Sequence, residues 1–560
     1  MPPRTAAVTL SNLTFAWPDG SVVLDQVSGT FGSGRTGLVG ANGTGKSTLL
    51  RLVAGRLRPT SGSVVTSGVV DYLPQDLAAT GATTAGATLA DLLGVAPVLA
   101  ALRAIEHGDA DPAHFETVGD AWDVEERSLA ALAEAGLTVD RLDRPVATLS
   151  GGETVLAALV GIVVRAADVV LLDEPTNNLD APSRERLVTL LARWRATLVV
   201  VSHDTDLLDT MDETVELRDG GLRVFGGAYG HYTAQIAVEQ DAARQALRTA
   251  EQALATERRQ RQQLEQRVAH AERSGRTDRA NRRFVPAAID MRVNAAQKSA
   301  GARRGQADAK VAAAQAAVVD AEAAVRADDR VVIDLPDPRV PAGRRIAALT
   351  GTDARSHIIA GPERVALSGP NGVGKTTLLR CLLADEGRST ERGTKPEVRP
   401  SSGASSLVGP GPVAELYVDR VGYLPQLLDG LDDDATVLAA VRAAAPTVAP
   451  GEVRRRLARF HLRGDQVDRL VGSLSGGERF RVAMARLMLA EPPADLLVLD
   501  EPTNSLDLVT QAQLVDALGA WRGALLVVSH DRAFLDQLDL DVELTLDAAG
   551  VLTPATSGHR

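Results

Sequence analysis

The chain has 560 residues, a length that corresponds to three or four structural units at about 150 residues per domain. Hydrophobic residues make up 45% and charged residues 24%, as in globular proteins, and the net charge of −12 excludes a protein that is basic overall. A single cysteine excludes an internal disulfide framework, and no apolar run approaches a membrane helix of about 18 residues or forms a signal peptide. We therefore expect a cytoplasmic protein.

The first recognisable element is a phosphate-binding loop, GANGTGKS at 40–47, between a strand-like and a helix-like apolar run. In GxxxxGK[ST], glycines let backbone N–H groups turn toward a phosphate, and the following helix adds the positive end of its dipole. We expect Lys46 to reach the β- and γ-phosphates and the Ser47 hydroxyl to hold Mg²⁺.

Two further apolar runs end in acidic and histidine residues suited to phosphate chemistry. VVLLDEP at 169–175 is typical of a buried parallel strand that ends in two carboxylates. We expect Asp173 to join the Mg²⁺ shell and Glu174 to polarise an attacking water, because a purely structural buried acidic pair would be costly. His203, after the next apolar run, is assigned to the γ-phosphate.

The motif LSGGE at 149–153 supplies glycine-rich N–H groups at a helix start, which is another type of anion site. The phosphate loop already provides ligands for its own nucleotide. We therefore expect this motif to close a nucleotide that is bound by a second copy of the same domain.

A helical segment follows, from about Val238 to Arg330, built largely of strong helix formers. Its apolar residues keep heptad-like spacings, at Leu247, Ala250, Leu254, Leu264 and Val268 and again at Val311, Ala314, Val318, Ala321 and Val325. We predict two helices that pack antiparallel.

The same segment carries positive charge within an acidic chain. Residues 257–304 hold thirteen Arg or Lys against five Asp or Glu. A charged hairpin that merely spaces two domains is one interpretation, but concentrated positive charge favours contact with a polyanion. The candidate RNA contacts are Arg273, Arg276, Arg279, Arg282, Arg283 and Arg292, with Phe284 available to stack on a base.

The last part of the chain repeats the motifs of the first about 327 residues later. The repeats are GPNGVGKTTLLR at 369–380, YLPQ at 423–426 (after 72–75), LSGGE at 474–478, VLDEPTNSLD at 498–507 and VVSHD at 527–531. The second copy carries about 22 extra residues at 386–412, which we interpret as a flexible surface insertion. Cys381, in the helix after the second loop, is expected to be buried.

This set of motifs resembles the ATP-binding cassette superfamily, over nearly the whole chain outside the helical segment. The resemblance implies an α/β fold class with two P-loop NTPase ATP-binding-cassette domains, 1–236 and 331–560, joined by an antiparallel α-helical hairpin linker, 237–330. It also implies an ATPase, a monomer in which the two cassettes pair head-to-tail around two ATP molecules.

The resemblance assigns site residues motif by motif. The ATP-binding residues are Gly40, Asn42, Gly43, Gly45, Lys46, Ser47 and Thr48 in the first loop, and Gly369, Asn371, Gly372, Gly374, Lys375, Thr376 and Thr377 in the second. Ser475, Gly476 and Gly477 would complete the first site, and Ser150, Gly151 and Gly152 the second. The catalytic residues are Gln75, Glu174 and His203, and Gln426, Glu501 and His530. Ser47, Asp173, Thr376 and Asp500 would hold Mg²⁺, and Trp17 takes the position of the adenine-stacking aromatic.

Both copies read EPTNxLD, and a charged linker joins two cassettes, which resembles the F branch of the superfamily. Members of that branch act on ribosomes, where the linker contacts rRNA and P-site tRNA, so we expect a ribosome partner and no membrane partner. Some members regulate translation and others dislodge ribosome-targeting antibiotics, and the sequence leaves both open. A tandem ATPase subunit of a membrane importer and a DNA-associated scaffold are the alternatives.

Two departures from the family pattern stand out. Asn178 and Ser505 occupy the position where the family carries histidine. The second copy has no aromatic residue from Val331 to Gly369, which puts its adenine platform in doubt. The two sites are therefore expected to hydrolyse ATP at different rates.

Overall fold

The computed structural model describes residues 8–75, 77, 86–177, 179–280, 286–326, 335–370, 372–384, 411–425, 430–460, 462–474, 476–503 and 506–554; the side chains of 271, 272 and 274–300 also lie outside this description. Several expected site residues fall outside the described ranges: Asn371, Gln426, Ser475, Arg282, Arg283 and Phe284, together with Asn178, Ser505 and most of 386–412. The chain divides into two compact units, one of Met1–Tyr229 with Arg330–Arg560 and one of Gly230–Asp329.

The first cassette is built on a six-stranded sheet of order β5-β6-β7-β3-β8-β9, in which only β8 and β9 pair antiparallel. The strands are β3 (Arg35–Val39), β5 (Val70–Leu73), β6 (Val169–Asp173), β7 (Thr197–Val201), β8 (Glu213–Arg218) and β9 (Gly221–Gly226). Every residue of β6 and β7 is buried, because alternate side chains enter two different cores. Val169 and Leu171 belong to one core, and Val170 and Leu172 to the other.

One of these cores lies against a small antiparallel sheet of order β2-β1-β4. It consists of β1 (Val8–Ala16), β2 (Val22–Phe31) and β4 (Ser61–Thr66), with α1 (Lys46–Val53) packed beside it. The other core is mainly helical, with α2 (Leu89–Leu93), α3 (Ala96–Glu106), α4 (Pro112–Val118), α5 (Val124–Glu134), α6 (Gly151–Arg165), α7 (Ala181–Ala192) and α8 (Thr205–Leu208). The phosphate-binding helix and the LSGGE helix therefore belong to different layers.

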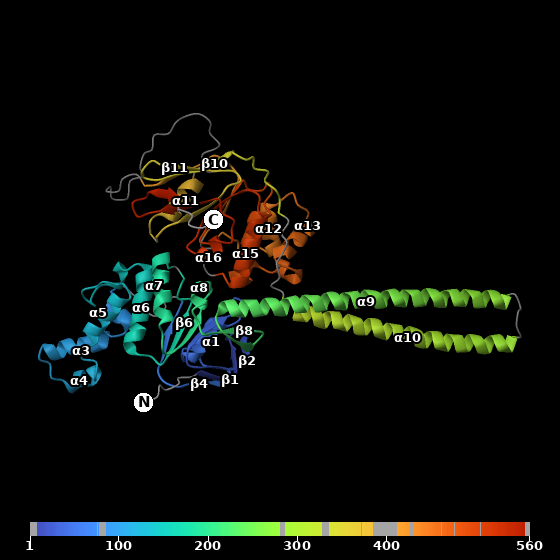
Figure 1. The fold of residues 1–560 in the computed structure, drawn as a ribbon, viewed down its shortest axis with the longest axis horizontal. Helices are drawn as coiled ribbons and strands as arrows, with labels where there is room; N and C mark the ends of the chain where they lie inside the picture. Colours follow the sequence, from blue (N-terminus) through green and yellow to red (C-terminus); the bar gives the residue numbers. More distant parts are fainter. Residues whose placement is uncertain are drawn as a thin grey trace. The chain divides into compact units, whose positions relative to one another are not determined.

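The second cassette repeats this plan, with a six-stranded sheet of order β14-β15-β16-β12-β17-β18 and a small sheet of order β11-β10-β13. Its strands are β10 (Arg345–Thr350), β11 (Ser356–Ala360), β12 (Arg364–Ser368), β13 (Val413–Leu416), β14 (Val421–Leu424), β15 (Leu496–Asp500), β16 (Ala524–Val528), β17 (Val542–Leu546) and β18 (Leu552–Pro554). Its helices are α11 (Lys375–Ala384), α12 (Val437–Ala444), α13 (Pro450–Leu457), α14 (Gly476–Met488), α15 (Leu508–Ala520) and α16 (Arg532–Leu535) (Figure 1).

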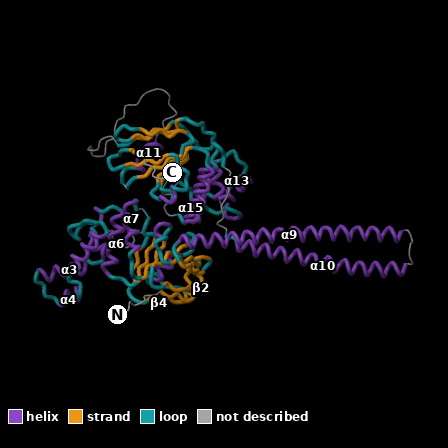
Figure 2. Tube along the Cα trace, in the orientation of Figure 1, coloured by secondary structure: helices purple, strands orange, loops and turns teal. Residues whose placement is uncertain are grey.

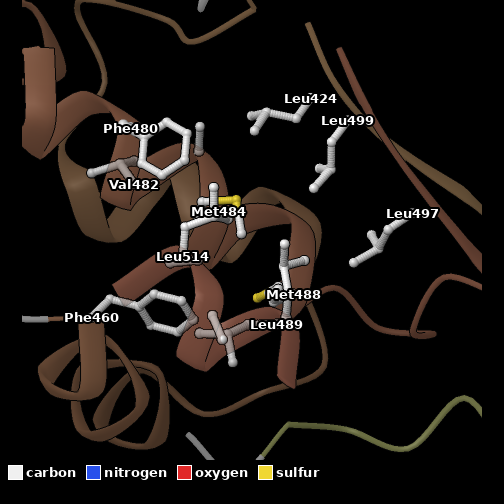
Figure 3. Packing of buried hydrophobic residues seen from close by; sticks show 14 of the residues in the cluster. Leu424, Phe460, Phe480, Val482, Met484, Met488, Leu489, Leu497, Leu499 and Leu514 are labelled. Carbon is white, nitrogen blue, oxygen red and sulfur yellow. The ribbon is translucent and has the colours of Figure 1, made fainter. Parts of the chain in front are cut away.

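The helical core of the second cassette gathers side chains from α14, α15 and the central strands. Figure 3 shows Phe460, Phe480, Met484 and Met488 packed together, with Leu497 of β15 nearby. Burial of large apolar side chains of this kind stabilises a fold by roughly 1.5–3 kcal/mol each.

The expectation that Cys381 is buried is wrong, because the thiol is exposed. Leu378, Leu379 and Leu382 form the inward face of α11 and fill its contact with the sheet. Cys381 lies between them on the opposite face, beside the exposed Arg380.

The second unit consists of two long helices, α9 (Tyr229–Ala280) and α10 (Pro286–Ala324), which lie side by side (Figures 1 and 2). The heptad seam that we predicted is confirmed. All ten seam residues are buried or half-buried, namely Leu247, Ala250, Leu254, Leu264, Val268, Val311, Ala314, Val318, Ala321 and Val325. An ion pair from Arg261 Nε to Asp308 Oδ1, at 2.5 Å, also joins the helices.

Candidate nucleotide sites

The two phosphate loops join a strand to a helix, β3 to α1 and β12 to α11, which is the context that the motif predicts. Gly40 has a φ of 152°, and a Cβ atom on it would lie 2.5 Å from the carbonyl oxygen of Leu217. Gly369 has a φ of 147°, and its Cβ would lie 2.2 Å from the carbonyl oxygen of Leu546. Glycine is required at both positions because each loop passes directly over a neighbouring strand.

The two loop lysines are buried beside their own loops. Lys46 Nζ donates to the carbonyl oxygen of Gly40 at 2.6 Å, and Lys375 Nζ donates to that of Gly369 at 2.7 Å. Burial lowers the pKa of both lysines, while the carboxylates of Glu174 and Glu501 oppose the shift. Each loop thus holds a buried amine next to backbone that can bind phosphate.

The acidic pairs lie at the carboxyl ends of β6 and β15. The Ser47 hydroxyl donates to Asp173 Oδ1 at 2.9 Å, so the loop and the strand end meet. Glu174 and Glu501 have φ values of 50° and 47°, a left-handed conformation that is uncommon outside glycine. Such backbone strain is typical of functional sites.

Each of these glutamates faces the histidine that was assigned to the γ-phosphate. Nε2 of His203 lies 3.0 Å from Glu174 Oε1, and Nε2 of His530 lies 3.3 Å from Glu501 Oε1. Burial raises the pKa of Glu174 to about 8 and that of Glu501 to about 7. Burial also lowers the pKa of His203 to about 3 and that of His530 to about 4, with the nearby lysine acting in the same direction.

The oxygen atoms beside the loops fit a small hard cation. Both carboxylate oxygens of Asp500 are buried, and the hydroxyls of Thr376 and Tyr423 lie beside them. Hydroxyl and carboxylate oxygens are the ligands that Mg²⁺ takes in nucleotide sites, where phosphates and water complete its shell. The residues expected to hold it, Ser47 with Asp173 and Thr376 with Asp500, therefore fit the ion.

Two tyrosines that we did not single out also belong to these clusters. The hydroxyl of Tyr72 donates to Asp173 Oδ2 at 3.0 Å, and burial raises the pKa of Tyr72 to about 12. Tyr423 lies beside Asp500 in the second cassette. The repeated YLPQ motif carried this signal, because it contains each tyrosine three residues before the expected glutamine.

The LSGGE motifs begin the helices α6 and α14. In α6 the Ser150 hydroxyl accepts from the Glu153 N–H at 3.3 Å, while the Glu153 side chain accepts from the Ser150 N–H at 2.8 Å. A Cβ on Gly152 would lie 2.5 Å from the Ser183 hydroxyl oxygen, whereas Gly151 and Gly476 face open space.

Each phosphate loop borders a cavity. The cavity beside the first loop, of about 410 Å³, is lined by loop residues with Trp17, Gln75, Glu174 and His203. The cavity beside the second loop, of about 430 Å³, is lined by both cassettes, with Lys375 and Thr376 from one and Glu174 and Arg184 from the other. The described LSGGE residues line neither cavity, so completion of each site by the opposite LSGGE motif stays a prediction.

The cassettes nevertheless contact each other at the first loop. The N–H of Asn42 donates to Asp507 Oδ2 at 2.6 Å. Asp507 also caps α15, where its Oδ1 accepts from the N–H of Thr510 at 2.7 Å. The carboxylates of Asp507 and Asp180 act reciprocally on Lys46 and Lys375, since each opposes the lowering of the lysine pKa in the other cassette.

The candidate RNA contacts lie in the second unit. Arg273, Arg276 and Arg279 belong to α9 and Arg292 to α10, and the side chain of Arg273 is exposed. Among the described residues of the whole chain, no helix combines the length and apolar character needed to cross a lipid bilayer.

A family model described as ABC transporter matches residues 24–177 and 355–504. The tylosin resistance ATP-binding protein TlrC of Streptomyces fradiae is 32% identical over 92% of this chain and 93% of its own length. ABC transporter F family member 2 of Arabidopsis thaliana is 27% identical, covering 95% and 76%, and the energy-dependent translational throttle protein EttA of Mycobacterium tuberculosis is 29% identical, covering 92% and 87%. A crystal structure of the archaeal ribosome recycling factor aABCE1 with the ribosomal stalk protein aP1 matches with a TM-score of 0.51 at 18% identity, over 97% of this chain and 89% of that chain, which is a likeness in fold.

Proposed function

The chain belongs to the ABC-F family of tandem ATP-binding-cassette proteins, and we propose that it is an ATPase that acts on the ribosome. The observation that carries the proposal is the basic segment 257–304, with thirteen Arg or Lys against five Asp or Glu in a chain of net charge −12. Positive charge gathered on one helical unit of an acidic protein suits a polyanion such as rRNA or tRNA. The relatives TlrC and EttA, named for antibiotic resistance and for translation, support the same assignment.

The reaction that we propose at each site is hydrolysis of ATP to ADP and phosphate. Lys46 and Lys375 contact the phosphates, while Ser47 with Asp173 and Thr376 with Asp500 hold Mg²⁺. When bound, the ion neutralises negative charge on the phosphate oxygens.

The glutamate at each site positions the attacking water and takes its proton. Each acts as a base in its ionised form, and burial, which raises the pKa of Glu174 to about 8 and that of Glu501 to about 7, makes both carboxylates stronger bases than a free glutamate. His203 and His530 stay neutral at that pH, because burial depresses their pKa values. Each histidine holds its glutamate through the backbone, because the N–H of His203 donates to Glu174 Oε2 and that of His530 donates to Glu501 Oε2, both at 3.3 Å, and the neutral imidazole adds no positive charge.

ATP is proposed to close the two cassettes within one chain and to set the helical unit in its ribosome-binding state. The contact from Asn42 to Asp507 already joins the first phosphate loop to the opposite cassette, and the LSGGE motifs complete the sites on closure. Hydrolysis then releases the protein. The γ-phosphate biases this two-state switch because it is present in only one of the two nucleotide states.

For the finer function, we propose that the protein protects cytoplasmic ribosomes from an antibiotic rather than regulating elongation in general. The 32% identity to TlrC over nearly both full chains supports this choice. Expression in a sensitive host should raise the inhibitory concentration of tylosin, tested first, or of another ribosome-targeting drug. Slowed translation without any change in drug sensitivity would contradict protection and favour the regulatory function.

The test of ribosome binding reverses the charge of the basic segment. The variant carries Arg276→Glu, Arg279→Glu, Arg282→Glu and Arg283→Glu, and the matched control carries Arg58→Glu, Arg141→Glu, Arg455→Glu and Arg522→Glu, which change four exposed arginines of the cassettes. We expect the first variant to lose ATP-dependent sedimentation with ribosomes while the control keeps it, because only the first removes phosphate contacts. Unchanged sedimentation of the first variant, or cofractionation with a membrane, would contradict the proposal.

A further inference from the structure

We propose that the second nucleotide site recognises the triphosphate but not the base, so that it accepts any nucleoside triphosphate, whereas the first site also binds the base by stacking it on Trp17. The inference rests on the proposed function in one respect, namely that both phosphate loops bind nucleotides. It follows from a difference between the two cassettes in the β-hairpin that precedes each loop.

In the first cassette this hairpin reaches the nucleotide site. A tight turn joins β1 to β2, in which the N–H of Trp17 donates to the Ser21 carbonyl oxygen at 2.9 Å. Trp17 lines the cavity beside Lys46, and its ring stands edge-on to that of Phe15, with centroids 5.0 Å apart. The indole is 37% exposed, so it is held on one side and open on the other. A stacking platform needs this combination.

The same hairpin supports the first phosphate loop directly. A Cβ on Gly45 would lie 2.8 Å from both Val23 Cγ1 and Leu24 Cδ2 of β2. The corresponding Gly374 of the second loop has no described atom within 4 Å of its Cβ position. The second loop therefore lacks the hairpin that covers the first.

The hairpin of the second cassette is eight residues shorter. Val8 pairs with Phe31, 23 positions later, whereas Arg345 pairs with Ala360, 15 positions later. Phe31 and Ala360 both lie four positions before the next strand, so they occupy equivalent positions at the base of the two hairpins. The difference in length therefore lies toward the tips.

The shorter hairpin ends in an equivalent turn, in which glycine replaces the tryptophan. The Gly351 N–H donates to the Arg355 carbonyl oxygen at 2.9 Å, as the Trp17 N–H does to Ser21. A side chain at Gly351 would meet backbone, because its Cβ would lie 2.8 Å from the Leu552 nitrogen. An aromatic platform is thus sterically excluded at this position.

The turn between β17 and β18 also binds the tip of the shorter hairpin and so keeps it away from the second nucleotide site. The Thr352 N–H donates to the Gly550 carbonyl oxygen at 2.9 Å, and the Thr352 hydroxyl donates to the Ala549 carbonyl oxygen at 2.8 Å. In the first cassette the equivalent β8–β9 hairpin packs on β2 away from the Trp17 turn, where a Cβ on Gly29 would lie 2.9 Å from Leu222 Cδ1. That packing leaves the Trp17 turn free to cover the nucleotide.

No other aromatic side chain of the second cassette replaces Trp17. Tyr417 stacks under Arg345, 4.7 Å from the ring centroid, at the opposite end of β10, and Tyr423 lies beside Asp500. The remaining ones, Phe460, Phe480, Trp521 and Phe534, are buried, the first two in the core of Figure 3. None of these six lines the cavity beside Lys375, and the residues of this cassette outside the described ranges include no Phe, Tyr or Trp.

The two sites therefore differ in which parts of the nucleotide contribute to its binding affinity. A base stacked on an aromatic ring contributes about 5- to 150-fold in affinity, which corresponds to about 1–3 kcal/mol at 1.4 kcal/mol per tenfold. Stacking is tolerant of base identity, so affinity at the first site depends more on the presence of a base than on its type. The second site retains only its phosphate contacts, which are the same for every nucleoside triphosphate.

The experiment isolates each site in the full chain by removing the lysine of the other. The Lys46→Ala variant reports the second site, and the Lys375→Ala variant reports the first. Calorimetry with Mg²⁺ then compares ATP, GTP, UTP and ribose 5′-triphosphate, which lacks a base. For the second site we expect all four dissociation constants to agree within about threefold. For the first site we expect ATP to bind at least about fivefold more tightly than ribose 5′-triphosphate.

A further variant controls for folding and for the role of Trp17. Trp17→Ala in otherwise unaltered protein should weaken one of the two ATP-binding events by at least about fivefold and leave the other unchanged. A second site that binds ATP tenfold more tightly than ribose 5′-triphosphate, or that binds no triphosphate, would overturn the inference and leave the first site as evidence for the proposed function. Absence of nucleotide binding at both sites would overturn the proposed function itself.

Discussion

Replacing both site glutamates with glutamine should stabilise the nucleotide-free protein at alkaline pH. Glu174 and Glu501 are buried, and their pKa values are raised from 4.5 to about 8 and about 7. Between the unfolded and folded pKa values the folded chain binds more protons than the unfolded chain, so stability falls as pH rises through this window. The double variant Glu174→Gln/Glu501→Gln carries no such charge and lacks this loss.

The size of the effect follows from the shifts. One pKa unit is worth about 1.4 kcal/mol, which gives on the order of 3–5 kcal/mol for each glutamate at pH 9 and less than about 1 kcal/mol at pH 5. For domains of this size 1 kcal/mol corresponds to roughly 2–4 °C in Tm. We therefore expect the Tm advantage of the variant to grow by at least about 5 °C between pH 5 and pH 9.

The assay is thermal unfolding followed by circular dichroism in nucleotide-free, Mg²⁺-free buffer. Glu185→Gln, which changes an exposed glutamate on α7, is the matched control and should show no such trend. A Tm advantage that is the same at pH 5 and pH 9 would refute the argument, because it would mean that the site glutamates ionise in the folded chain as readily as in water.

Three further predictions concern the same machinery. Because His203 and His530 have lowered folded pKa values, their own contribution to stability falls as pH drops below about 6.5, opposite in sign to that of the glutamates, so the Tm of the double His→Asn variant relative to the unaltered protein should rise between pH 7 and pH 5. Gly152→Ala places a Cβ 2.5 Å from a serine oxygen of α7 and should lower Tm, whereas Gly151→Ala, which faces open space, should not; equal Tm values would contradict the packing. Asp507→Ser keeps a helix cap but shortens the side chain that reaches the first loop, so fluorescence energy transfer between labelled cassettes should fall while helicity is unchanged.

Much of this architecture follows from local sequence, because the motifs sit where strands end. The runs before Asp173 and Asp500 are short and apolar at every position, a pattern that is typical of a strand buried on both faces. The heptad spacing of Val311 and its successors likewise predicts the helix pair, since one face of each helix must be covered.

Other features depend on contacts between segments that are distant in the chain, and local sequence patterns do not predict them. Asn42 and Asp507 are 465 positions apart in the chain and are joined by a hydrogen bond. Nothing in the sequence around either residue indicates the other as its partner. The exposure of Cys381 depends on which face of α11 the leucines occupy, and the motif that precedes it does not settle this. The missing tryptophan is visible in the sequence, but the steric block at Gly351 comes from the β17–β18 turn and is visible only in three dimensions.

The central claim, that nucleotide-driven closure of the cassettes places this protein on the ribosome, is tested most directly by sedimentation. The Glu174→Gln/Glu501→Gln variant should bind ATP without hydrolysing it and hold the cassettes closed, because it lacks both groups that we propose take a proton from water. At physiological salt we expect the variant to pellet with ribosomes in ATP and to remain in the supernatant in ADP. Absence of pelleting, with ATP binding confirmed, would contradict the claim and redirect the search to a membrane or DNA partner.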